Sequence, residues 1–576
     1  MQSISWRNTS SSWETLVWAL SISALAGHQI MRKYDGFFLK LHASVVLLPP
    51  AVAAWYAMSL QIGQMSLVST MALCYAIYLG ALCTTVVAYR LSPFHPLYRY
   101  PGPFWCRTSM FVHAVRTTTG KQMTYLKALH ERYGDVVRIG PNAISVRDAS
   151  LVGPVLGPSG LPKSAFFTGT VLTESNIHLS GIRDLEEHAI RRRPWVRGLA
   201  PPALREYEQI GAARIYQLVN RLAEQKGVVI LGQWFNYLAY DFMSDMAFGG
   251  GSELMRDGDQ TGLWTTLEKG TATALFMGQV PWLGVYLGHI PGAARAVNEF
   301  LEYSREQAMK RLARGSITRD LFHYLANEDL PKKDPPPTAQ LRSDGLLVIL
   351  AGSDTTSSGL TSVFYGLMTD PSAYACLQQE VDRFYPPDED VCTTKHHRDL
   401  HYVTAVINES LRLFPPTPTN SSREVPHNSK SLIYNNVLLP PGTLIHIPHY
   451  VLHRDPRNFV FPDTFWPERW LIASGQLELE SARLPHGLTQ PPPGHGKPKF
   501  EFVHNDAAFI PFSIGPMNCP GKGLAMQQMR MVICALVQRF RFRLQEGWDS
   551  RRYEEDFKDY FTANRPDLPV HIEPRY

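Results

Sequence analysis

Charged residues are absent from Ala43 to Tyr89, although they make up 19% of the whole chain. An uncharged run of this length can cross a bilayer twice, because one helical span takes about 20 residues. The sequence Gln-Ile-Gly-Gln at residues 61–64 predicts a short loop between two such helices. A weaker apolar segment, Thr15 to Met31, is a candidate for a third span. A buried core is the alternative interpretation, but residues 1–92 are best explained as a membrane anchor with two or three transmembrane helices.

Basic residues beside these segments indicate an orientation. Arg32, Lys33 and Lys40 lie between the first two spans, and Arg90 and Arg99 follow the last one. Lysine and arginine accumulate in cytoplasmic loops, so three spans would place the large C-terminal part in the cytoplasm. The chain is therefore expected to be a multi-pass protein of an internal membrane, with the endoplasmic reticulum favoured.

A proline-rich stretch, residues 93–103, follows the apolar region. Its prolines fix φ and lack an N–H donor, so it predicts a stiff hinge before a second domain at residues 93–576. Within that domain, residues 203–226 and 292–314 have the apolar spacing of amphipathic helices. Two further segments predict an apolar entrance lid and a surface loop, respectively residues 263–291 and 475–499.

Composition narrows the class of protein. A chain of 576 residues with 45% hydrophobic residues is globular and exceeds one ordinary domain. Its net charge of +5 is mild for this length, which argues against a nucleic-acid-binding protein. Seven cysteines, with no C-x-x-C pair, argue against a disulfide framework or a zinc knuckle.

One cysteine lies in a setting that favours chemistry. Cys519 stands in Phe512-Ser-Ile-Gly-Pro-Met-Asn-Cys-Pro-Gly521, just before an apolar helical pattern. Gly515 allows a tight turn, and Gly521 lets the backbone pass close to a flat ligand. Amide groups at the start of the following helix would stabilise a thiolate and lower the pKa of the thiol. The pattern predicts a metal ligand at Cys519, and a buried cysteine in a turn is the alternative.

Asp354 is the only charged residue from Gly345 to Thr369. It follows Gly352, which costs about 1 kcal/mol in a helix interior and so suggests a close approach by another group. It precedes Thr355, and an acid next to an alcohol is what proton delivery to bound dioxygen requires. The alternative is that Asp354 caps a broken helix.

Two other groups of charges stand out. His188 and Arg192 are spaced to share one helix face, which could bind carboxylates or simply be a solvated basic face. Glu409 and Arg412 have the spacing of a common surface pair, although Pro-Glu-Arg469 follows downstream.

The cysteine segment resembles the haem-binding loop of the cytochrome P-450 family, Phe-x-x-Gly-x-x-x-Cys-x-Gly. The acid-alcohol helix, Glu-x-x-Arg and Pro-Glu-Arg occur in the order typical of that family, and the hinge resembles its fungal members. The resemblance implies a mainly α fold with small β sheets, preceded by the anchor. It also implies haem b, with Cys519 as the axial ligand of the iron.

The resemblance further implies roles for individual residues. Gly352 makes room for oxygen, Thr355 orients a water or hydroperoxide, and Asp354 relays protons. Residues expected to bind the haem group are Phe512, Gly515, Gly521, His188, Arg192 and Arg423, with Trp195 as a weaker candidate. Glu409, Arg412 and Arg469 are expected to form a buried network that supports the cysteine loop. Met517 departs from the pattern, because the family usually has a basic residue there.

The function implied is a monooxygenase that inserts one oxygen atom from O2 into an apolar small molecule, with electrons from an NADPH-dependent flavoprotein reductase. The fungal character suggests specialised metabolism. A haem-thiolate isomerase or dehydratase that uses no O2 is one alternative, and Asp354 with Thr355 argues against it. A membrane protein that only carries haem is another, and it would leave the proton-delivery residues unexplained.

Overall fold

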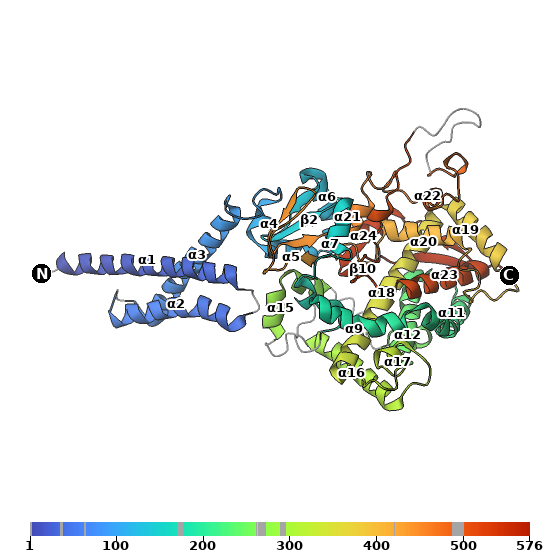
Figure 1. Ribbon diagram of the computed structural model, residues 1–576, viewed down its shortest axis with the longest axis horizontal. Coiled ribbons are helices and arrows are strands. Elements are labelled where there is room, and N and C mark those ends of the chain that lie inside the picture. The colour runs from blue at the N-terminus through green and yellow to red at the C-terminus, as the bar shows by residue number, and fades with distance from the viewer. Residues whose placement is uncertain are drawn as a thin grey trace.

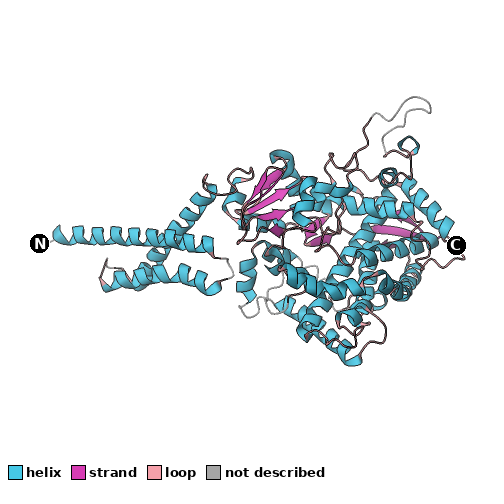
Figure 2. Ribbon diagram, viewed as in Figure 1, coloured by secondary structure: helices cyan, strands magenta, loops and turns pink. Residues whose placement is uncertain are grey.

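The computed structural model describes residues 3–34, 38–62, 65–169, 177–260, 262, 272–288, 295–419, 421–485 and 500–576. Figure 1 shows an elongated group of N-terminal helices that leads into a larger rounded body. Figure 2 shows that the body is mostly helical, with small groups of strands. The predicted mainly α fold with small β sheets is therefore confirmed.

The three N-terminal helices are α1 (Ser3–Lys33), α2 (Leu39–Ser59) and α3 (Leu67–Leu91). They lie side by side, and Tyr78 of α3 donates a hydrogen bond of 2.6 Å to the carbonyl oxygen of Val45 in α2. Among the described helices, only α2 and α3 are both long and apolar enough to cross a membrane. α1 packs against them through an apolar face that includes Leu20 and Ala24.

The junction between α3 and the body is held by two arginines. Arg90, in the last turn of α3, donates a 2.6 Å hydrogen bond to the carbonyl oxygen of Thr108 in the body. In return, Arg138 of the body donates a 3.1 Å hydrogen bond to the carbonyl oxygen of Arg90. Residues 93–103 form neither helix nor strand, as their prolines predict. These two hydrogen bonds therefore fix the end of α3 to the body.

The helices of the body differ widely in length. The first ones are α4 (Phe104–Thr108), α5 (Met110–Thr117), α6 (Gln122–Tyr133), α7 (Val152–Leu156), α8 (Phe166–Gly169), α9 (Leu185–Gly198), α10 (Pro201–Glu206), α11 (Glu208–Ala223), α12 (Leu231–Phe248) and α13 (Leu254–Asp257). They are followed by α15 (Pro281–Gly288), α16 (Arg295–Arg314), α17 (Leu321–Leu325), α18 (Thr338–Thr369), α19 (Pro371–Phe384), α20 (His401–Leu413), α21 (His449–His453), α22 (Glu468–Ala473), α23 (Lys522–Arg539) and α24 (Arg551–Asp556).

The described residues of the body also form four small sheets. The strands are β1 (Val136–Arg138), β2 (Ala143–Val146), β3 (Val228–Ile230), β4 (Arg423–Glu424), β5 (Leu432–Tyr434), β6 (Val437–Leu439), β7 (Leu444–His446), β8 (Phe540–Leu544), β9 (Lys558–Tyr560), β10 (Thr562–Asn564) and β11 (Pro569–Pro574). They pair in the orders β1-β2-β7-β4, β3-β11-β8, β5-β6 and β10-β9. The β9-β10 pair is an antiparallel hairpin in which Thr562 faces Tyr560.

α18 runs through the body without a break and packs along α12. Its apolar residues join those of α20 and α23 in the main core, and Leu360, Val406 and Val532 are fully buried there. Asp354 lies well inside α18, so the alternative in which it caps a broken helix is wrong.

Two predicted segments are only partly described. Residues 263–271 and 289–291 of the expected entrance lid lie outside the described residues, and its described part contains α15. Residues 486–499 of the expected surface loop also lie outside them.

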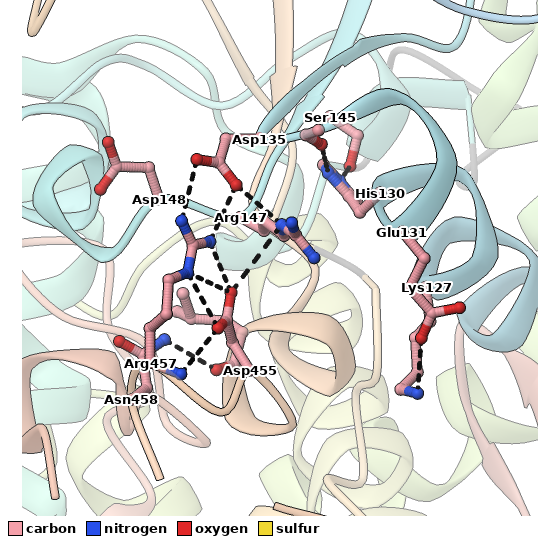
Figure 3. Close-up of polar contacts among 12 residues, drawn as sticks. Lys127, His130, Glu131, Asp135, Ser145, Arg147, Asp148, Asp455, Arg457 and Asn458 are labelled. Carbon is pink, nitrogen blue, oxygen red and sulfur yellow. Dashed lines mark hydrogen bonds and ion pairs between the residues drawn. The ribbon is translucent and has the colours of Figure 1, made fainter. Parts of the chain in front are cut away.

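A charged network ties the sheet at β1 and β2 to the chain that approaches the cysteine loop (Figure 3). Arg457 donates hydrogen bonds to Asp135 at 2.8 Å and to Asp455 at 2.6 Å, and Arg147 donates one to Asp135 at 2.8 Å. The adjacent residue, Asn458, accepts a backbone hydrogen bond of 2.9 Å from residue 505. The network therefore connects the sheet to the segment that leads to Cys519.

Candidate active site

The cysteine loop is shaped by Gly515 and by two backbone hydrogen bonds. The amide of Cys519 donates to the carbonyl oxygen of Phe512 at 2.9 Å, and the amide of Asn518 donates to that of Gly515 at 3.1 Å. Gly515 has a φ of +75°, and a Cβ there would lie 2.2 Å from the carbonyl oxygen of Leu156. Only glycine fits this position. The loop therefore presents Cys519 at a fixed point just before α23.

Cys519 faces a cavity of about 320 Å³. A stretch of α18 that includes Gly352 and Thr355 also lines the cavity, and α9 contributes His188, Arg192 and Trp195. Phe512 and Gly521 also line the cavity. The structure thus brings most of the predicted site residues around one space, although they come from distant parts of the sequence.

The surroundings of the Cys519 thiol act in opposite directions on its pKa. Burial raises the pKa, whereas the amide groups of Gly521 and Lys522 and the charge of Arg192 lower it. Burial has the larger effect, so the expected net lowering by the helix N-terminus is not found. A cation bound beside the sulfur would favour the thiolate form.

No group of three or more His, Cys, Asp or Glu side chains is arranged to hold a metal ion among the described residues. The single thiol of Cys519 fits a metal ion whose other ligands are the nitrogen atoms of a flat macrocycle.

Three cationic side chains line the cavity, Lys163, Arg192 and Arg423, together with the imidazole groups of His188 and His449. In the described part of the chain, none of them forms an ion pair with a carboxylate, and Lys163 and Arg423 are 7% and 4% exposed. Burial, with Arg423 and Arg192 nearby, lowers the pKa of Lys163 to about 7. Burial also lowers the pKa of His188 to about 3, so its imidazole group is neutral near pH 7, and it lowers the pKa of Arg423 to about 10. Buried unpaired cations are costly, so an anionic ligand fits here.

Lys163 was not predicted from the sequence. It is the only charged residue between Asp148 and Glu174, so it is an isolated charge in an uncharged stretch, as Asp354 is. Met517 of the cysteine loop lines the same cavity as Lys163.

The acid-alcohol pair of α18 is divided between two sides of the helix. Thr355 lines the cavity and donates a 2.6 Å hydrogen bond to the carbonyl oxygen of Ala351. Asp354 does not line the cavity and instead bonds to Thr562 and Arg565. A Cβ at Gly352 would lie 2.5 Å from Cε of Met243, so the space above this glycine holds a methionine side chain of α12.

Glu409, Arg412 and Arg469 form a fully buried network, so a surface pair is excluded. Arg412 donates two hydrogen bonds of 2.8 and 2.9 Å to Glu409, and Arg469 donates one of 3.1 Å. The amide of Trp466 and the indole N–H of Trp470 also bond to Glu409, at 2.9 and 3.0 Å. Although burial raises the pKa of Glu409, the two arginines outweigh this effect and lower it to about 2.

This network reaches the cysteine loop through His453, which was not predicted. Arg412 donates a 3.0 Å hydrogen bond to the carbonyl oxygen of His453. The imidazole Nε2 of His453 accepts one of 3.0 Å from the amide of Ile510, shortly before the loop. The network therefore has a direct link to the chain that carries Cys519.

Comparison with known proteins agrees with this geometry. The sequence profile of the family described as Cytochrome P-450 matches residues 100–567. Cytochrome P-450 monooxygenase FCK2 of Fusarium pseudograminearum is 31% identical over 87% of this chain and 86% of its own. Tryprostatin B 6-hydroxylase of Neosartorya fischeri is 28% identical over 87% of this chain and 86% of its own. Trichothecene C-15 hydroxylase of Fusarium sporotrichioides is 30% identical over 86% of this chain and 96% of its own. The chain belongs to the cytochrome P-450 family.

Proposed function

We propose that this protein is a membrane-anchored haem-thiolate monooxygenase that hydroxylates an apolar small molecule in fungal specialised metabolism. The observation that carries the proposal is the cavity that joins the thiol of Cys519, the three cations Lys163, Arg192 and Arg423, and the alcohol of Thr355. Membership of the family supports the monooxygenase activity.

The cofactor proposed is haem b, held by the thiolate of Cys519 on its iron. Lys163, Arg192 and Arg423 would pair with its two carboxylates, and the neutral imidazole of His188 would donate a hydrogen bond to them. When bound, the haem group activates O2 with two electrons and two protons, so that one oxygen atom enters a C–H bond and the other leaves as water.

Residues of α18 would deliver protons to the bound oxygen and leave room for it in the cavity. The hydroxyl group of Thr355 faces the cavity and can hold a water there, while Asp354 is the carboxyl group next to it in sequence. Gly352 leaves room that the flexible side chain of Met243 can vacate for oxygen.

The substrate proposed is an apolar specialised metabolite. Apart from the cations, the cavity wall is largely apolar and includes Phe167, Leu179, Leu347 and Val348. Two relatives are named for hydroxylation of tryprostatin B and of a trichothecene, which supports this class of substrate.

The electron donor proposed is an NADPH-dependent flavoprotein reductase. A second cavity, of about 740 Å³, shares Pro511, Phe512 and Ser513 of the cysteine loop with the first. Its charged and histidine lining consists of His397, Arg398, His401, Lys522 and Arg530, opposed by Asp506. This excess of basic groups favours an acidic partner close to Cys519.

The membrane proposed is that of the endoplasmic reticulum, with the body in the cytoplasm and O2 and the substrate reaching it from there or from lipid. α2 and α3 would span the bilayer. α1 would be a third span, since Trp18, Ile22 and Leu25 are exposed on the side of α1 that its partners leave uncovered.

The carbon monoxide spectrum of the reduced protein tests the haem-thiolate centre. We expect the red-shifted absorption of a sulfur-ligated haem group in the wild-type protein and its loss in Cys519→Ala. NADPH and O2 consumption with added reductase then separates a monooxygenase from the alternatives, because neither an O2-independent isomerase or dehydratase nor a haem carrier takes up O2.

A further inference from the structure

The carboxyl group of Asp354 is held by the C-terminal hairpin. Thr562, the first residue of β10, donates a hydrogen bond from Oγ1 to Oδ2 of Asp354, and Nη1 of Arg565 lies 3.5 Å from Oδ1. The neighbouring Thr355 instead faces the cavity. The proposed proton donor and the proposed proton acceptor therefore point to different sides of α18.

Arg565 is fixed by more than this ion pair. Its Nη2 donates a 2.9 Å hydrogen bond to Ser357, and its Nε donates one of 3.1 Å to Thr361. Positions 354, 357 and 361 share one face of a helix. The Arg565 side chain is only 5% exposed, and its guanidinium group contacts Thr361, Ser357 and Asp354 along this face of α18.

The tip of the hairpin connects this arrangement to the cavity. Phe561 is the single residue between β9 and β10 and has a φ of +75°, which is uncommon for a bulky side chain. Its ring stacks on Phe166 with centroids 6.0 Å apart, and Phe166 contacts Phe167 edge to face at 5.3 Å. Phe167 lines the cavity. A row of three rings thus runs from the cavity to the residue next to Thr562.

We propose that Thr562 and Arg565 are positioning residues that set the direction of the Asp354 carboxyl group, and that Phe561 makes this direction respond to the molecule that fills the cavity. The inference rests on the proposed monooxygenase function. Asp354 passes one proton towards Thr355 when it turns from the Thr562 hydroxyl group, and it regains one proton from water on the hairpin side.

Cumene hydroperoxide tests the proposal without the native substrate or a reductase. Heterolysis of its O–O bond takes two electrons from the bound haem group and a proton for the leaving oxygen, and releases cumyl alcohol. Homolysis takes one electron and releases the cumyloxyl radical, which fragments to acetophenone and a methyl radical. The ratio of the two products, measured with the full-length protein in lipid vesicles, therefore reports proton delivery.

We expect Thr562→Val and Arg565→Gln each to lower the ratio of cumyl alcohol to acetophenone by about tenfold, as for a displaced general acid. Arg565→Lys should restore most of the ratio because it keeps the charge. The solvent deuterium isotope effect on the ratio should change in the same variants, which a purely structural role would not cause. Thr562→Val retains the Arg565 ion pair and so provides the test if Arg565→Gln does not fold.

Arg543→Gln is the matched control, since Arg543 is an exposed residue of β8 paired with Glu573, and it should leave the ratio unchanged. Naphthalene, as an apolar filler, should shift the ratio in the wild-type protein but not in Phe561→Ala. An equal shift of the product ratio in the wild-type protein and in Phe561→Ala would overturn the proposed role of Phe561. A normal carbon monoxide spectrum with an unchanged ratio in both Thr562→Val and Arg565→Gln would overturn the positioning role alone, whereas a wild-type protein without that spectrum would overturn the proposed function.

Discussion

Arg192 donates two hydrogen bonds to Asn518, the residue that precedes Cys519: one of 2.6 Å to its backbone carbonyl oxygen and one to its side-chain oxygen. The same guanidinium group lines the cavity together with the cations Lys163 and Arg423. Arg192 therefore joins α9 to the cysteine loop and contributes charge where the carboxylates of haem would lie.

Replacement of Arg192 by alanine should weaken haem binding more than any surface substitution on α9. Each hydrogen bond from a charged donor contributes about 1.5–3 kcal/mol, so we expect a loss of about tenfold or more in haem retention. The haem-to-protein ratio after gel filtration measures it. Arg193→Ala removes an exposed arginine from the same helix and is the control. Equal retention in both variants would contradict the role of Arg192.

Lys163 should act as the replacement for the basic residue that Met517 lacks. Lys163→Met is expected to lower haem retention by about the same factor, because a buried cation facing an anionic group is lost. Lys163→Arg should retain haem. In the Lys163→Met background, Met517→Arg should restore retention, since it returns a cation to the same cavity. Failure of this rescue, with normal folding, would show that Lys163 serves another purpose.

Glu409→Gln should strongly destabilise the body. It leaves Arg412 and Arg469 buried without a counter-charge, and breaking a buried pair costs about 3–5 kcal/mol. Chemical unfolding followed by circular dichroism measures the change. Glu131→Gln, in the exposed pair with Lys127 shown in Figure 3, should cost less than about 1 kcal/mol. A comparable loss in the two variants would be inconsistent with the buried network.

The same carboxyl group predicts a dependence on pH. The pKa of Glu409 is about 2 in the folded protein, below the ordinary value of 4.5. A lowered pKa contributes stability that is fully present above the unfolded value and is lost as the pH falls through the folded value. The wild-type protein should therefore lose this contribution between about pH 4.5 and pH 2, and Glu409→Gln should lack that part of the acid transition.

Thr355→Ala should leave haem binding intact but divert electrons from product to hydrogen peroxide. Thr355 lines the cavity together with Gly352 and Thr356 of α18, and its hydroxyl group can hold a water there. NADPH consumption, peroxide and product, measured together with added reductase, give the yield per electron pair. Thr355→Ser keeps the hydroxyl group and should behave like the wild-type protein. An unchanged yield in Thr355→Ala would remove this residue from the proton path.

Local patterns in the sequence predicted much of the fold and part of the site. α9 and α18 cover the segments whose apolar spacing and charges indicated helices, and Glu409 and Arg412 lie on α20 as expected. The motif around Cys519 pointed to the correct family because its glycines and cysteine are close together in the sequence. These features depend on neighbours within a few residues.

The contacts between distant segments could not be predicted in the same way. Thr562 and Arg565 meet Asp354 only because the C-terminal hairpin packs on α18, and no spacing in the sequence encodes that approach. The pKa of Cys519 was expected to be lowered because its helix N-terminus was visible in the sequence, whereas the burial that raises the pKa was not. Lys163 differs from these residues, because the sequence itself shows it as an isolated charge among uncharged residues and could have marked it as a candidate site residue.

The hydrogen bonds that Arg90 and Arg138 form at the junction between α3 and the body matter when the chain is shortened to obtain a soluble form. Arg138 is fully buried, and burial lowers its pKa to about 10. It shares its hydrogen bonds between Pro141 and the carbonyl oxygen of Arg90. A shortened protein that starts after residue 92 lacks the carbonyl oxygen of Arg90, which accepts from Arg138, and the Arg90 guanidinium group, which donates to the carbonyl oxygen of Thr108. Versions that start a turn earlier, before Arg90, should keep the native edge of the body intact.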